Sequence, residues 1–211
     1  MARKTNKKTS KKVSAKASKK SPRKAVPKAG GAKAVSPQAK TPLNKAPATG
    51  KAAGKTHALA EGMAAPTFRL SRDDGSSVSL KDFAGRNLVL YFYPRADTPG
   101  CTRESIDFSR LAKDFAGADT SVLGISADEV KAQAKFRDKH ELTVPLGSDT
   151  DHAVIEAYSA WGEKSMYGKT FLGVLRTTVL VGRTGKVERL WRNVKVDGHA
   201  EEVLAATRAL P

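Results

Sequence analysis

The first 60 residues constrain the fold most, because they lack the side chains from which a hydrophobic core is built. They contain no Asp, Glu, Phe, Trp or Tyr, whereas 17 of them are Lys or Arg. Such a segment buries too little apolar surface to offset the conformational entropy lost on folding. We therefore predict a disordered basic tail over residues 1–60 and one folded domain over residues 61–211, a length typical of a single domain.

The net charge of +17 lies entirely in this tail, because residues 61–211 hold 21 basic and 21 acidic residues. Lysines release counterions from a phosphate backbone without reading the base sequence, so we predict non-specific DNA binding by the tail. The stretch Ser21-Pro22-Arg23-Lys24 resembles the S-P-K-K element of linker-histone tails. A solvated extension without function and an organellar transit peptide are the alternatives. The basic residues assigned to the contact with DNA are Lys7, Lys8, Lys11, Lys12, Lys19, Lys20, Arg23 and Lys24.

The chain has a single cysteine, Cys101. It can therefore form neither an intrachain disulfide nor a cysteine-rich metal site, and a lone thiol suits a reducing compartment better than secretion. No apolar run reaches the ~18 residues of a membrane span, and the tail contains no signal-peptide core. We expect a cytoplasmic protein without a membrane partner, associated with the nucleoid through its tail. A nucleus or an organelle is the alternative location.

Neither a metal ion nor an organic cofactor is expected. The histidines of the predicted domain, His140, His152 and His199, are scattered and lack the spacing of metal ligands. We assign them surface or capping roles.

Strand and helix patterns alternate along the predicted domain. Leu88–Tyr93 and Ser121–Ser126 are apolar on both faces, which predicts buried strands. Phe68–Leu70 is predicted to be a short edge strand before an Asp74-Gly75 turn. This order predicts an α/β fold with a mixed central sheet flanked by helices. Further strands are expected at Val144–Leu146, Thr177–Val181 and Val187–Trp191, and helices at Cys101–Phe115, Asp128–Lys139, Asp151–Tyr158 and His199–Leu210.

Cys101 follows a buried strand and a polar loop, and it falls in the first turn of a predicted helix. Unpaired backbone N–H groups and the positive end of the helix dipole favour a thiolate at such a position. A buried, inert cysteine is the commoner fate of a lone thiol. A polar loop that contains Gly100 disfavours burial of the thiol as an inert residue, so we interpret Cys101 as reactive.

The stretch from Tyr91 to Glu104, YFYPRADTPGCTRE, closely resembles the active-site segment of peroxiredoxins of the bacterioferritin-comigratory-protein, or PrxQ, type. The family signature P-x-x-x-T-x-x-C corresponds to Pro94, Thr98 and Cys101. The resemblance covers residues 61–211 and implies a thioredoxin-like fold. It continues, in the same order, at Trp161–Lys164, Tyr167–Lys169, Arg176–Thr178 and Val194–Ala200.

The resemblance also implies residue roles. Cys101 is expected to be the peroxidatic nucleophile, and Thr98 to orient the peroxide through its hydroxyl and to bond the sulfur. Pro94 is expected to shield the site from water, and Arg176 to reach the thiolate. Arg cannot lose its proton at any relevant pH, and a cation there stabilises the charge that develops on the leaving oxygen.

Two further residues support this set. Glu104 lies one helical turn after Cys101 and is expected to hold Arg103 or Arg176, and Gly100 belongs to the turn that precedes the cysteine. Trp161 is interpreted as a packing residue that lines the approach to the site.

Many family members carry a second, resolving cysteine five residues after the first, but here that residue is Ile106. The resemblance therefore implies a one-cysteine peroxidase for hydrogen peroxide and organic hydroperoxides. Its Cys101 sulfenic acid must be reduced by an external thiol, thioredoxin-like or glutathione-linked, or by Cys101 of a second molecule. We expect a monomer or a weak dimer. The rival hypothesis is a nucleic-acid-binding protein with a redox-sensing peroxiredoxin-like domain.

Overall fold

The computed structural model describes residues 58–166 and 168–211. The predicted tail up to residue 57, including its eight proposed DNA-contacting residues, lies outside the described residues, so its disorder and its binding to DNA stay predictions. Among the described residues, no helix is both long enough and apolar enough to cross a membrane. The described chain begins at Ala58, and Leu59 is already buried.

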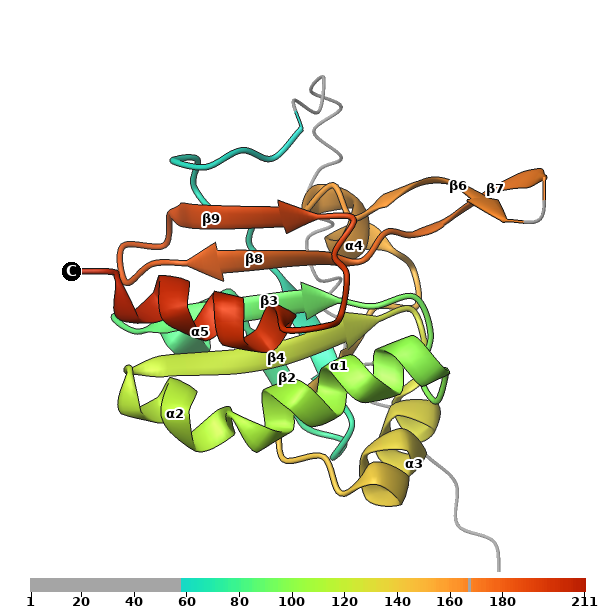
Figure 1. Ribbon diagram of the computed structural model, residues 1–211, viewed down its shortest axis with the longest axis horizontal. Coiled ribbons are helices and arrows are strands. Elements are labelled where there is room, and N and C mark those ends of the chain that lie inside the picture. Colours follow the sequence, from blue (N-terminus) through green and yellow to red (C-terminus); the bar gives the residue numbers. More distant parts are fainter. Residues whose placement is uncertain (1–57, 167) are drawn as a thin grey trace, which may run out of the picture. The chain divides into compact units, whose positions relative to one another are not determined.

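Seven strands form one mixed sheet in the order β2-β1-β5-β4-β3-β8-β9, and a separate hairpin pairs β6 with β7 (Figure 1). Strands β3, β4 and β5 are parallel, and the other pairs are antiparallel. The prediction of an α/β fold with a mixed central sheet is therefore confirmed. The strands are β1 Arg69–Arg72, β2 Ser77–Ser79, β3 Asn87–Phe92, β4 Thr120–Ser126, β5 Leu146–Ser148, β6 Trp161–Met166, β7 Lys169–Val174, β8 Thr177–Val181 and β9 Val187–Arg192.

The helices cover the sheet through two apolar clusters. The helices are α1 Pro99–Arg110, α2 Ala112–Gly117, α3 Val130–His140, α4 Ala153–Ala157 and α5 His199–Arg208, with a 3-10 turn at Leu80–Phe83. Because successive strand residues point to opposite faces, β3 contributes to both clusters. One face of the sheet packs against α4 and the segment from Leu59 to Phe68. The other face packs against α1, α2, α3 and α5.

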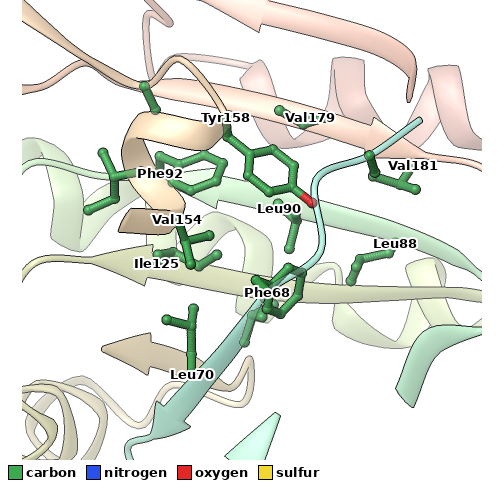
Figure 2. Packing of buried hydrophobic residues seen from close by; sticks show 14 of the residues in the cluster. Phe68, Leu70, Leu88, Leu90, Phe92, Ile125, Val154, Tyr158, Val179 and Val181 are labelled. Atoms are coloured by element: carbon green, nitrogen blue, oxygen red, sulfur yellow. The ribbon is translucent and has the colours of Figure 1, made fainter. Parts of the chain in front are cut away.

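Figure 2 shows the first cluster, in which Leu88, Leu90 and Phe92 of β3 lie near Tyr158 and Phe68. The Phe92 and Tyr158 ring centroids are 5.3 Å apart, and the Tyr158 hydroxyl donates to a backbone carbonyl at 2.7 Å. All six residues of β3 are buried, as the continuous apolar run predicts. The loop that leads to α1 departs from the end of this buried strand.

Several predicted boundaries were wrong. Strand β1 is not an edge strand, because it pairs with both β2 and β5; the edge is β2, which is too short to give a sequence pattern. The helix predicted over Cys101–Phe115 begins at Pro99 and is interrupted at Leu111, whose φ of −91° and ψ of 4° leave helical geometry. Strand β5 begins at Leu146, after Pro145, which has no N–H to donate.

The β6–β7 hairpin was not predicted. It extends away from the main sheet (Figure 1). Its two strands pair over their full length, from Trp161 opposite Val174 to Met166 opposite Lys169. Gly162 and Gly173 face each other in this ladder, and charged residues interrupt the apolar alternation. The usual period-two signal of a half-buried strand is therefore weak here.

Candidate active site

The loop between β3 and α1 is held in place by side chains of α3 and the segment before it. The Ala96 N–H donates to Asp128 Oδ2 at 2.7 Å. Asp97 adopts a left-handed φ of 58° and accepts bonds from Lys139 Nζ, at 2.7 and 2.8 Å, while His140 Nε2 lies 2.8 Å from Oδ1. Hydrogen bonds from His140 and Lys139 lower the pKa of Asp97. These contacts fix the direction in which α1 begins.

Cys101 is the third residue of α1, which starts with Pro99 directly after Thr98. The first bond within the helix runs from the Thr102 N–H to the Thr98 carbonyl at 2.8 Å. The N–H groups of Gly100 and Cys101 therefore have no acceptor inside the helix. They contribute to the positive helix end, which favours an anion on the cysteine sulfur. Cys101 is only 1% exposed, so the sulfur lies within the fold.

Arg176 brings a cation to this sulfur. It lies in the short connection between β7 and β8, and its Nη2 is 3.3 Å from Cys101 Sγ. Its Nη1 donates to Glu104 Oε2, which forms an ion pair one turn further along α1. The Glu104 side chain is 1% exposed and that of Arg176 15%. A Cβ on Gly100 would lie 3.3 Å from Arg176 Nη2, so glycine leaves room for the guanidinium there.

The charges in this cluster act on the protonation of Arg176 and of Glu104. Burial disfavours the Arg176 cation, but the charges of Glu104 and Cys101 outweigh that cost and raise the pKa of Arg176 above its usual value. Burial raises the pKa of Glu104 to about 7, and Arg176 opposes that rise. Glu104 Oε1 has no hydrogen-bond partner among the described residues. Arg176 therefore stays charged, whereas Glu104 titrates near neutral pH.

The structure thus brings together Cys101, Arg176, Glu104 and Gly100. Glu104 pairs with Arg176, whereas Arg103 forms an exposed ion pair with Asp197 at 2.7 Å.

The other two predicted site residues lie in the preceding loop. Pro94 is half-buried at the start of this loop. The Thr98 hydroxyl donates to the Arg95 carbonyl at 3.0 Å. Among hydrogen bonds of residues 58–166 and 168–211, none joins Thr98 to the sulfur, so the predicted Thr98–sulfur bond and peroxide orientation stay predictions.

The histidines differ from their predicted surface roles in one case. His199 is 4% exposed and lies 2.8 Å from the Thr178 hydroxyl. Burial lowers the pKa of His199 to about 4. His140 lies against Asp97, and His152 stacks on Trp161 with ring centroids 4.2 Å apart. The described part of the chain contains no cluster of His, Cys, Asp and Glu that could hold a metal ion.

Sequence reasoning missed the residues that anchor the loop. Asp128, Lys139 and His140 lie 32 to 43 residues from their partners in the chain. No local pattern marks such contacts, although Asp128 lies in a loop two residues after the end of the buried strand β4.

A cysteine at a helix start beside an arginine, on a sheet of this topology, defines a class of thiol-based redox enzymes. Comparisons with known proteins agree. Residues 62–190 match the model of the AhpC/TSA family. Peroxiredoxin Bcp of Xanthomonas campestris is 46% identical over 140 residues, which are 66% of this chain and 88% of that protein. Peroxiredoxin Bcp of Bacillus subtilis is 40% identical over 143 residues, 68% of this chain and 91% of that protein.

Solved structures show the same fold. Peroxiredoxin Q of Xanthomonas campestris superimposes with a TM-score of 0.65 at 45% identity, covering 67% of this chain and 90% of that one. A ligand-complex structure of the bacterioferritin comigratory protein of the same organism, described by its alkyl peroxide reduction activity, also gives 0.65, at 44% identity and the same coverage. The thioredoxin-like fold is thereby confirmed.

The chain belongs to the AhpC/TSA family of peroxiredoxins. It is therefore a thiol-dependent peroxidase, with a peroxide substrate and a thiol reductant, and its single cysteine fits the one-cysteine form.

Proposed function

We propose that Cys101 is the peroxidatic nucleophile of this enzyme, activated by Arg176 and by the first turn of α1. The observation that carries the proposal is the 3.3 Å contact between Arg176 Nη2 and Cys101 Sγ at a helix N-terminus. A cation and free N–H groups at this distance favour the thiolate, which is the reactive form of cysteine.

In the first step the Cys101 thiolate attacks the terminal oxygen of a hydroperoxide. An S–O bond forms and the O–O bond breaks, which leaves Cys101 sulfenic acid and an alkoxide, or hydroxide, that takes a proton from water. Negative charge moves from sulfur to the leaving oxygen during this step. Arg176 and the N–H groups of Gly100 and Cys101 face that charge, so they stabilise the transition state more than the ground state.

Thr98 and Pro94 complete the proposed site. Because the Thr98 hydroxyl donates to the Arg95 carbonyl, its lone pairs remain to accept a hydrogen bond from the O–H of the peroxide. Pro94 has no N–H and is half-buried at the start of the loop, and its proposed role is to limit water at the reacting atoms.

An external thiol completes the cycle. A first thiol converts the sulfenic acid into a mixed disulfide and releases water, and a second thiol restores Cys101. Ile106, at the position where many relatives carry a second cysteine, is 42% exposed and cannot take this role. We propose a thioredoxin-like or glutathione-linked reductant. The alkyl peroxide reduction described for the Xanthomonas campestris relative supports organic hydroperoxides as substrates besides hydrogen peroxide.

Replacement of Cys101 by Ser tests the proposal. The Cys101→Ser variant should consume no hydrogen peroxide or cumene hydroperoxide with dithiothreitol as reductant, while its circular dichroism spectrum matches that of the unaltered protein. Thiol-dependent turnover that persists in this variant would sink the assignment.

We also propose that the basic tail concentrates the peroxidase near DNA in the cytoplasm, and that the enzyme works as a monomer or weak dimer. The support for the DNA contact is the charge of residues 1–60, with 17 basic and no acidic residues before a neutral domain. Such a location would place a peroxide scavenger where oxidants damage DNA.

A further inference from the structure

One face of the β6–β7 hairpin carries a lysine that points toward the base of the hairpin. Lys164 on β6 pairs with Phe171 on β7, and Gly162 pairs with Gly173, so all four residues share a face. A Cβ on Gly173 would lie 3.3 Å from Lys164 Cδ and 3.8 Å from Phe171 Cε2. Both side chains therefore lean over the bare Gly173 backbone.

This direction leads to the active site. Strand β7 ends at Val174, and Arg176, which contacts the cysteine sulfur, follows two residues later. The Lys164 side chain thus runs from the middle of β6 back toward the connection that holds Arg176. Burial lowers the pKa of Lys164, the Arg176 cation lowers it further, and Cys101 raises it. Both influences agree with the direction of the side chain, which the contact over Gly173 sets toward the connection that holds Arg176.

Within residues 58–166 and 168–211, no carboxylate forms an ion pair with Lys164. None of the ion pairs within 4 Å in the described part of the chain includes Lys164, whereas Arg176 is paired with the buried Glu104. The neighbouring Glu163 is exposed and points to the opposite face of the hairpin. When Glu104 is ionised, the Arg176–Glu104 pair has no net charge, so the charge of Lys164 adds to the balance of a thiolate.

We propose that Lys164 is a second electrostatic residue of the peroxidase site, which stabilises the Cys101 thiolate from the hairpin side and so increases its reactivity. The inference rests on the proposed role of Cys101. It adds a function for the hairpin, which directs the Lys164 side chain toward the connection that holds Arg176.

The experiment measures the pH dependence of Cys101 alkylation by iodoacetamide, a neutral reagent, without peroxide or reductant. In Lys164→Met the profile should move to higher pH by about half to one unit, because a cation near an anion favours ionisation. Alkylation well below the midpoint should then be roughly three- to tenfold slower. Lys164→Arg, which keeps the charge, should retain the original profile, and Lys131→Met, an exposed lysine on α3, is the matched control.

A profile of Lys164→Met that coincides with the unaltered one would overturn the proposal, and so would equal shifts in Lys164→Met and Lys164→Arg. Lys164→Gln repeats the test should the methionine variant fail to fold. Because alkylation needs no peroxide, a failure of this inference is distinct from a failure of the peroxidase assignment, which would show as absent turnover in the unaltered protein.

Discussion

The active-site geometry makes its sharpest prediction for the effect of removing the Arg176 cation. Arg176→Ala takes away a charge 3.3 Å from the Cys101 sulfur, on a side chain that is 15% exposed. Two unit charges about 4 Å apart interact by about 4 kcal/mol at the effective dielectric constant of such sites. An opposite charge at this range moves the titration of its partner by about one to three pH units.

The Arg176→Ala variant should not leave the Glu104 carboxylate as an unpaired charge in the interior. Burial already raises the pKa of Glu104 to about 7, and Arg176 is the main influence that opposes the rise. Without Arg176, Glu104 should bind a proton at neutral pH and become neutral. The fold should therefore survive, and the measured change should report on the site chemistry.

Two assays follow. The iodoacetamide profile of Cys101 should move to higher pH by about one to three units. The rate constant for oxidation by hydrogen peroxide should fall on the order of 10²-fold. It is measured by stopped flow at a pH where Cys101 is ionised in both the unaltered protein and the variant. Arg103→Ala, which breaks only an exposed pair with Asp197, is the control. An unchanged profile together with an unchanged rate constant in Arg176→Ala would refute the electrostatic argument.

Three further predictions concern other parts of the chain. Thr98→Val should reduce the rate of peroxide consumption by about ten- to a hundredfold while Thr98→Ser keeps most of it, because only the serine retains the hydroxyl; equal rates in both variants would speak against the role of Thr98. Burial lowers the pKa of His199 from 6.5 to about 4, so the unfolded chain binds a proton in this window that the folded protein does not, and stability falls as the pH drops from 6.5 to 4. This loss is about 3 kcal/mol, and urea unfolding should show a correspondingly flatter pH dependence for His199→Asn; the same slope in both proteins would contradict the burial argument. Removal of residues 1–57, which keeps the buried Leu59, should abolish DNA binding in a gel-shift assay and leave peroxide turnover unchanged. If six lysines engage phosphates, the slope of log K against log salt should be about −5, and equal binding by the truncated protein would assign the contact elsewhere.

Local patterns predicted the elements that carry the nucleophile. The apolar run of β3 and the helix after Pro99 follow from hydrophobic periodicity and helix-start signals, so the place of Cys101 at a helix N-terminus was foreseeable. The partner of the sulfur was not foreseeable from patterns. Arg176 lies 75 residues away in the chain, and only the resemblance to peroxiredoxins pointed to it.

Other features depend on tertiary contacts that no periodicity reports. The β6–β7 hairpin has no continuous apolar face, so neither its strands nor the direction of Lys164 could be predicted. His199 was assigned a surface or capping role because the histidines are scattered without the spacing of metal ligands, yet it packs edge-on against Phe108 and Trp191 in the interior. Burial of a polar ring becomes visible only when the helices are assembled on the sheet.

The most direct test of the central claim is the chemical state of Cys101 after one equivalent of hydrogen peroxide. Intact-protein mass spectrometry with dimedone, which traps sulfenic acid, should show a single adduct, and peptide mapping should place it at Cys101. Subsequent addition of dithiothreitol to untrapped oxidised protein should restore the free thiol. A thiol that stays unmodified while peroxide is consumed, or an adduct at any other residue, would contradict the account.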